Sequence, residues 1–163
     1  MGPRDGKAVN LMSLGVRFLI RGEESGGGFS LVEHPIPPRT LAAPLHRHER
    51  EDEYSYVLTG HLGAQLGDDV VYAAPGDLVF KPRGQWHTFW NAGDEPCRIL
   101  EIISPAGFER YFEELGDTMA AVGAPDPGVI LAASDMPERY AIEFRPESIP
   151  RLCRAHGLRF PGM

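Results

Sequence analysis

Basic clusters and long apolar runs are both missing from this 163-residue sequence. Only two of the sixteen basic residues are lysines, and the formal net charge is −7. Such a chain offers no continuous surface for phosphates, so neither nucleic acid nor an anionic membrane is an expected partner. No segment approaches the roughly twenty apolar residues that a membrane-spanning helix needs. The sequence therefore predicts a soluble protein.

Cysteine is also scarce. Cys97 and Cys153 are the only two cysteines, and the first thirty residues contain charged side chains and no apolar run suited to export. These features favour a reducing, cytoplasmic location. The two cysteines lack the spacing of a metal site, so we expect buried, unpaired thiols.

Glycine and proline, by contrast, are abundant. The chain contains 19 glycines and 15 prolines, too many helix-breaking residues for a helix bundle. Its length and its 42% hydrophobic content suit one core, so a single domain is expected.

Short segments of strand character, separated by turn residues, fill the first two thirds of the chain. The predicted strands cover residues 15–22, 29–36, 43–48, 53–59, 61–66, 69–73, 77–81, 86–91 and 97–103. Strands this short need several neighbours to be stable. Their even spacing predicts an all-β barrel or sandwich.

Beyond residue 104 the pattern becomes helical. Ser104 is a suitable N-cap, followed by Pro105 at the first helical position. The apolar face of this first helix carries Phe108, Phe112, Leu115 and Met119, and its polar face carries Glu109, Glu113 and Asp117. A second helix is predicted from Asp126-Pro127, and a third over residues 148–156 with Gly157 as its stop.

The segment His46-Arg-His-Glu-Arg-Glu-Asp-Glu53 carries the strongest chemical signal. In an extended strand, His46 and His48 point to the same face, and Glu53 opens the next strand. His87 begins a later strand. Three neutral imidazoles and one carboxylate form a site suited to a divalent transition metal.

Each part of this pattern also has an ordinary explanation. Histidines two residues apart occur freely on surfaces, and His87 alone would suit a core histidine bonded to a carbonyl group. We expect Glu49, Glu51 and Asp52 to form a solvated acidic turn. The joint pattern outweighs these separate explanations.

That joint pattern resembles the two signature motifs of the cupin superfamily. The first motif, G(X)5HXH(X)3,4E(X)6G, is matched by His46, His48, Glu53 and Gly60, whereas Thr40 stands at its leading glycine. The second, G(X)5PXG(X)2H(X)3N, is matched throughout by Gly76, Pro82, Gly84, His87 and Asn91. The motifs span residues 40–91, and the strand rhythm extends the resemblance to about 15–104.

The resemblance implies a double-stranded β-helix, a barrel of jelly-roll type. The short helical tail at the C-terminus lies outside the resemblance and follows from the helical pattern beyond residue 104. The resemblance also implies one metal ion inside the barrel, held by His46, His48, Glu53 and His87. The ion could be Fe, Mn, Ni, Co, Cu or Zn, because all accept these ligands. We therefore divide the chain into an N-terminal arm (1–14), a cupin barrel (15–104) and a helical C-terminal extension that packs on the barrel (105–163).

Four protein ligands leave coordination positions free, which is typical of a catalytic site. The segment from Ser104 to Leu115 resembles the tail of quercetinase-like bacterial cupins. This resemblance implies a metal-dependent dioxygenase acting on a small aromatic or enolisable substrate, with Glu53 both holding the metal and accepting a hydroxyl proton.

Four further residues are candidates for substrate contact. Phe89 shares a strand face with His87 and would line the cavity if His87 points inward. Trp86 could stand at the cavity mouth, with core packing as the alternative. Ser55 lies on the same strand face as Glu53. Glu101 lies between apolar residues and could be either a rim acid or exposed to solvent.

Two other functions fit the same site. The metal could act only as a Lewis acid in a redox-neutral cyclisation or isomerisation. The cavity could also bind or sense a small ligand without turning it over. We further expect a homodimer, since the apolar strand Val16–Ile20 would be an uncovered edge.

Overall fold

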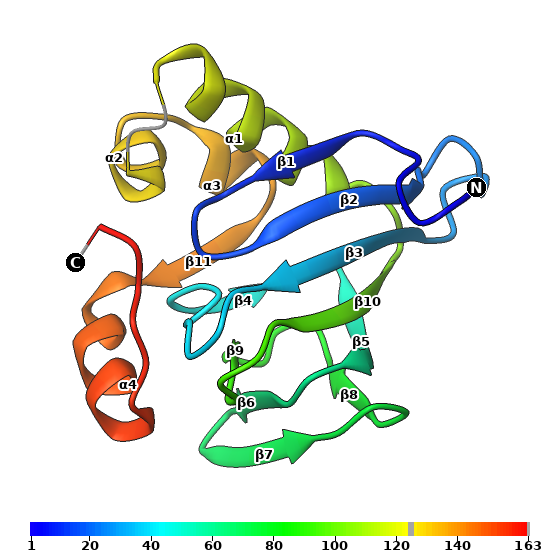
Figure 1. Cartoon of the computed structure of the whole chain (residues 1–163). Coiled ribbons are helices and arrows are strands. Elements are labelled where there is room, and N and C mark those ends of the chain that lie inside the picture. Colours follow the sequence, from blue (N-terminus) through cyan, green and yellow to red (C-terminus); the bar gives the residue numbers. More distant parts are fainter. Residues whose placement is uncertain (124–125, 163) are drawn as a thin grey trace.

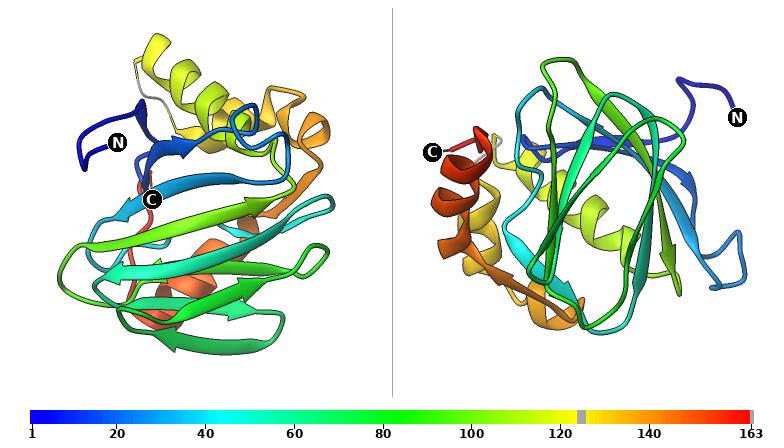
Figure 2. Two further views of the ribbon diagram at one scale, coloured as in Figure 1. Left: turned by 90° about the vertical axis from the view of Figure 1, so that its right-hand side faces the viewer. Right: turned by 90° about the horizontal axis from the view of Figure 1, so that it is seen from below.

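The computed structural model describes residues 1–123 and 126–162. Two antiparallel sheets face each other (Figure 1), and Figure 2 shows the same layers from two further sides. The first sheet has the spatial order β1 (Ala8–Asn10), β2 (Gly15–Ile20), β3 (Ser30–Ile36), β10 (Cys97–Ser104), β5 (Asp52–Thr59) and β8 (Leu78–Lys81). The second has the order β11 (Ile142–Arg145), β4 (Leu45–His48), β9 (His87–Asn91), β6 (Leu62–Leu66) and β7 (Asp69–Ala73).

All nine predicted strands are present, each with bounds within two residues of the prediction. The mostly β, jelly-roll architecture with a short helical tail is confirmed. β1 and β11 are the strands that the sequence did not predict. They have three and four residues, too few to show an alternation of apolar and polar positions.

β1 changes the expected edge of the first sheet. It pairs with β2 through Ala8–Arg17, Val9–Val16 and Asn10–Gly15. β2 therefore lies between β1 and β3, and the prediction of a free edge is wrong for Val16 and Arg17. Leu19 and Ile20 lie beyond the pairing with β1. The homodimer stays a prediction without this support.

The core lies between the sheets. Inward-pointing residues on alternate strand positions fill it, among them Val32, Val57, Ile99, Leu62 and Phe89, all at most 6% exposed. Cys97 lies in the same core as a free thiol, and Cys153 is a half-buried free thiol.

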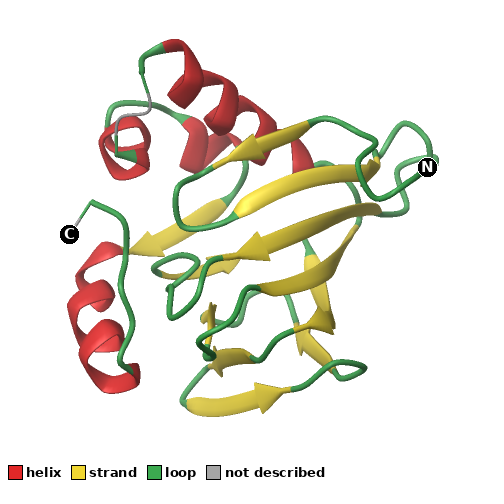
Figure 3. Ribbon diagram, in the orientation of Figure 1, coloured by secondary structure: helices red, strands yellow, loops and turns green. Residues whose placement is uncertain are grey.

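The helices lie outside the strands, along the top and left of the view in Figure 3. They are α1 (Glu109–Ala121), α2 (Pro127–Ala132), α3 (Met136–Arg139) and α4 (Ile149–His156), with the 3-10 turn η1 (Pro146–Ser148) before α4. The Asp126 carboxylate caps α2 by accepting a hydrogen bond from Gly128 N, and Gly157 ends α4 with φ +63°, both as predicted. None of the helices among the described residues is long and apolar enough to cross a membrane.

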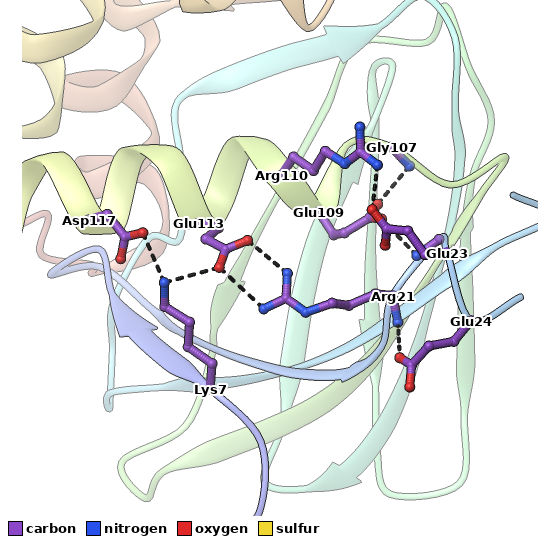
Figure 4. Close-up of polar contacts among 10 residues, drawn as sticks. Lys7, Arg21, Glu23, Glu24, Gly107, Glu109, Arg110, Glu113 and Asp117 are labelled. Atoms are coloured by element: carbon purple, nitrogen blue, oxygen red, sulfur yellow. Dashed lines mark hydrogen bonds and ion pairs between the residues drawn. The ribbon is translucent and has the colours of Figure 1, made fainter.

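α1 begins at Glu109, four residues after the predicted start at Pro105. Its apolar face, with Phe108 just before it, is buried as predicted. Glu109, however, is buried rather than exposed, because its carboxylate accepts hydrogen bonds from Gly22 N (3.0 Å) and Gly107 N (2.6 Å). Figure 4 shows this contact beside the ion pairs of Glu113 with Lys7 and Arg21, which tie α1 to the N-terminal strands.

Gly63 in β6 provides room for the indole ring of Trp90. A Cβ atom at Gly63 would overlap Trp90 Nε1, and Trp90 in turn stacks on His156 of α4 at 4.3 Å. We expect Gly63→Ala to lower the free energy of unfolding by about 1–3 kcal/mol, as overpacking does. Urea unfolding would measure this effect. The control is Gly28→Ala, where the new Cβ would meet only Ser25 O at 3.7 Å; equal stability of the two variants would contradict the prediction.

Candidate metal centre

Three strands bring the four predicted ligands together. β4 carries His46 and His48 on one face, and its neighbour β9 places His87 directly opposite His46. Glu53 comes from β5 in the other sheet. The four ligand atoms all lie within 4.8 Å of one another, and all four residues are buried.

Several polar atoms of this cluster have no hydrogen-bond partner. Glu53 Oε1 lies 2.6 Å from His48 Nε2 and 3.4 Å from His87 Nε2, yet none of the three atoms makes a contact with hydrogen-bond geometry. Unpartnered buried polar atoms are costly and rare. Their convergence on one point is what a site built to hold a cation requires.

Backbone carbonyl groups orient two of the three rings. His46 Nδ1 lies 2.7 Å from Pro44 O, and His87 Nδ1 lies 3.1 Å from Gln85 O. Since a carbonyl oxygen only accepts, each Nδ1 carries the hydrogen and donates it. Each Nε2 therefore presents a lone pair to the cluster, as a metal-binding histidine needs.

Glu51 faces the third ring without a hydrogen bond to it. Its Oε2 atom lies 3.7 Å from His48 Nδ1, and the residue is only 6% exposed. The prediction of a solvated acidic turn is therefore wrong for Glu51, because the turn folds back beneath His48. Burial raises the pKa of Glu51 above its usual value.

The electrostatics keep the cluster ready for a cation. Burial, followed by the imidazoles of His87 and His48, holds the pKa of His46 well below the usual 6.5, and burial also lowers the pKa of His87. Both rings are therefore neutral at physiological pH. Burial alone would raise the pKa of Glu53, but His48 and Lys81 outweigh it and hold that pKa well below 4.5. Glu53 is therefore ionised.

Three imidazoles and one carboxylate suit the divalent transition metals, so the donor set fits the predicted cofactor. The identity of the ion is not fixed by these ligands, which Mn, Fe, Co, Ni, Cu and Zn all accept. The cluster is suited to binding one such ion.

The cluster borders a cavity of about 890 Å³. His46, His48 and Glu53 line it from the barrel, together with the predicted contact residue Phe89. The helical extension lines much of the remainder, mostly with apolar and aromatic side chains, among them Phe108, Tyr111, Phe112, Leu115, Leu131 and Phe144. The site therefore lies where the barrel and the extension meet.

Three other predicted contact residues do not border this cavity. Ser55 and Glu101 are fully buried, and Ser55 Oγ donates a 2.5 Å hydrogen bond to Glu101 Oε2. The guanidinium groups of Arg47 and Arg145 lie over the Trp86 ring, 5.0 and 3.8 Å from its centre. Substrate contact by these three residues stays a prediction that the cavity does not support.

Asn91, the last residue of the second motif, is fully buried. Its side-chain amide donates to Ile36 O and Glu95 O, and its oxygen accepts from Gly93 N. Asn91 therefore caps the turn after β9 and does not bind the cluster.

Two buried residues near the centre were not predicted from the sequence. Lys81, fully buried, forms a 2.5 Å ion pair with Glu101, and its Nζ atom lies 4.4 Å from the centre of the Phe89 ring. His34 in β3 is 1% exposed and lines the cavity. Lys81 shares its short strand with three apolar residues, which by itself does not predict that the lysine is buried. His34 lies outside both motifs.

This geometry defines a jelly-roll barrel with an internal three-histidine, one-glutamate site. The family model for the Cupin domain matches residues 33–103. Together with the fold, this match places the barrel in the cupin superfamily.

The comparisons with individual proteins are more distant. The chain is 33% identical over 60 residues to the tetracenomycin polyketide synthase protein TcmJ of Streptomyces glaucescens, which covers 37% of this chain and 40% of that protein. Among solved structures, KdgF from Halomonas sp. superposes with a TM-score of 0.58 at 14% identity, covering 67% of this chain and 94% of that one. A predicted oxalate decarboxylase from Thermotoga maritima gives 0.54 at 25% identity, covering 56% and 80%.

Metal occupancy is expected to depend on pH. Protons compete with the metal for the ring nitrogens, so occupancy should stay constant from pH 8 to about 6 and fall below that, where free imidazole is protonated. The lowered pKa values of His46 and His87 delay this loss toward more acidic pH. Equilibrium dialysis at graded pH, followed by elemental analysis, measures it. Full occupancy at about pH 4 would contradict a three-histidine site.

Proposed function

We propose that the chain is a metal-dependent dioxygenase that acts on a small hydroxylated aromatic or enolisable substrate. One observation carries the proposal: a cluster suited to a transition metal forms part of the wall of a large, mostly aromatic and aliphatic cavity. About 890 Å³ falls within the range of small-molecule sites.

A divalent metal held by His46, His48, Glu53 and His87 would supply Lewis acidity and, if redox-active, electron transfer with dioxygen. The protein's own side chains account for binding. Phe108 stacks on Tyr111 at 4.8 Å and meets Phe112 edge-to-face at 5.2 Å, which makes a continuous aromatic wall. Such a wall favours flat, unsaturated molecules.

Glu53 supports the choice of substrate. Its carboxylate is ionised, so it is in the protonation state that can accept a proton at an oxygen atom. Its lowered pKa also makes it a weak base. Proton transfer to Glu53 therefore favours acidic hydroxyl groups, as in phenols and enols, over aliphatic alcohols.

A redox-neutral cyclisation is the second candidate. It is favoured by the similarity to a protein whose name assigns it to tetracenomycin polyketide synthesis, although the match spans less than half of either chain. In that reaction the same cavity would bind an enol and the same ionised Glu53 would accept its proton, without consumption of oxygen.

Oxygen uptake separates the two reactions. The metal-free chain is loaded separately with each of the six candidate metals and given quercetin or 1,3-dihydroxynaphthalene as probe. An oxygen electrode and mass spectrometry follow the reaction. We expect oxygen consumption in step with loss of a probe, and neither in the His48→Ala variant. Probe conversion without oxygen uptake would favour the cyclase, and no conversion with any of the six metals would contradict both.

We also propose a cytoplasmic homodimer. Its support is an exposed apolar face on three neighbouring strands, where Tyr56, Leu78, Phe80 and Ile102 are each at least 36% exposed. Light scattering after size exclusion is expected to give twice the 18.0 kDa mass of one chain. A monomer that persists at high concentration would contradict the dimer.

A further inference from the structure

His34 lies in the cavity without being part of the metal cluster. It comes from β3, where it pairs with Ile99 of β10. Its side chain is 1% exposed and shares the cavity wall with His46, His48 and Glu53. Neither cupin motif includes it, and the metal cluster is complete without it.

The protein fixes which ring nitrogen of His34 carries the hydrogen. His34 Nδ1 lies 2.9 Å from Gly15 O, and a carbonyl oxygen only accepts, so Nδ1 donates. In a neutral ring, Nε2 is then a hydrogen-bond acceptor. Burial, the largest effect, lowers the pKa of His34 to about 4, which keeps the ring neutral at physiological pH.

Aromatic neighbours hold the His34 ring in place. The Phe112 ring meets it edge-to-face at 5.2 Å, and the Phe89 ring lies 6.2 Å away at a tilt of 35°. Phe89 and Phe112 both line the cavity. The His34 ring is therefore a fixed polar group in an otherwise apolar part of the wall.

Nε2 of His34 makes no hydrogen bond within residues 1–123 and 126–162. Because His34 lines the cavity and Nε2 is not one of the fully buried side-chain atoms without a partner, a donor on a bound molecule can replace solvent at this acceptor. A bound molecule that carries only an ionised carboxylate would not supply that donor, whereas one with a hydroxyl group would. The acceptor thus selects among the molecules that the apolar wall admits.

We propose that His34 is a substrate-binding residue whose Nε2 atom accepts a hydrogen bond from a phenol or enol hydroxyl group of the molecule in the cavity. This inference rests on the proposed function for its substrate class. It adds a second polar anchor, on the opposite sheet from β4 and β9, so that the substrate is oriented between His34 and the metal cluster.

A binding cycle with two probes tests the inference. The probes are 1-naphthol and 1-methylnaphthalene, which have the same ring system and nearly the same size but differ in the hydroxyl donor. Affinities for the metal-free chain are measured by naphthyl fluorescence. His34→Phe is expected to reduce the preference for 1-naphthol over 1-methylnaphthalene by about 10-fold, the effect of one lost hydrogen bond.

Two further variants act as controls. His61→Phe makes the same exchange at an exposed histidine outside the cavity and should leave the preference unchanged. His34→Gln keeps an acceptor and should restore part of the preference. Should His34→Phe fail to fold, the response of the wild-type Nε2 nitrogen resonance to 1-naphthol gives the same information.

Three results would overturn the inference: an unchanged preference in His34→Phe, no shift of the Nε2 resonance with 1-naphthol, or no binding of 1-naphthol to the wild-type chain. Because the measurement uses neither metal nor turnover, its failure would leave the dioxygenase proposal standing. Conversely, a chain that binds 1-naphthol through His34 but shows no turnover would contradict only the enzymatic proposal.

Discussion

Replacing His48 with alanine is expected to lower the affinity for a divalent transition metal by on the order of 100-fold or more, since even outer-shell changes cost 10–100-fold. His48 Nε2 is one of four ligand atoms within 4.8 Å of one another. The barrel should stay folded, because the close neighbours of the lost ring are Phe108 and members of the metal cluster and its surroundings rather than the hydrophobic core between the sheets. Equilibrium dialysis and elemental analysis give the affinity, and circular dichroism gives the fold.

Two variants frame this result. His61→Ala removes an exposed histidine outside the cluster and should bind metal like the wild type. Glu51→Gln leaves all four ligands in place but removes the carboxylate that faces His48 Nδ1. We expect it to reduce affinity about 10-fold, as changes behind a metal-binding histidine do. Equal metal content in His48→Ala and wild type would rule out the site.

Removing one partner of the buried ion pair between Lys81 and Glu101 is expected to destabilise the metal-free chain strongly. Both side chains are fully buried, with Lys81 Nζ 2.5 Å from Glu101 Oε1. Glu101→Leu would leave the ammonium group unpaired in a dry interior, at a cost of about 3–5 kcal/mol. Lys81→Met should behave similarly, because it leaves the carboxylate unpaired.

The double variant Lys81→Met/Glu101→Leu separates charge from packing. With both charges gone, its stability should return close to that of the wild type, because apolar residues often replace a buried ion pair without loss. Urea unfolding with a chelator present measures all four proteins. The exposed pair of Arg39 and Asp94 is the control and should show little or no coupling. Additive effects at Lys81 and Glu101 would contradict the prediction.

The same pair explains part of what the sequence could not reveal. Glu101 was anomalous in an apolar strand, but its partner lies twenty residues earlier, on β8, and only the sheet brings them together through β5. The four ligands could be predicted because each motif keeps its residues close in sequence, with fixed strand parity. Their positions agree with that pattern.

Residues that depend on long-range packing were missed or misplaced. Glu51 was predicted to be a surface acid, but the turn before β5 places it beside His48. Glu109 was predicted to be exposed, but it accepts a hydrogen bond from Gly22 N. The sequence around His34 does not predict a role for it. That role depends on the hydrogen bond to Gly15 O and on the cavity wall formed by the helical extension. Strand periodicity predicts the walls of a barrel but not what covers its mouth.

The pairing of β11 with β4 has a consequence for engineering. β11 runs along the full length of β4, from Ile142 opposite His48 to Arg145 opposite Leu45, and Ser148 Oγ accepts a hydrogen bond from Leu45 N. A shortened chain ending at residue 104 would make β4 the border of its sheet, with bare amide and carbonyl groups beside two ligands. Transferring the metal centre to another scaffold would therefore require the last third of the polypeptide as well, because it supplies the strand that pairs with β4.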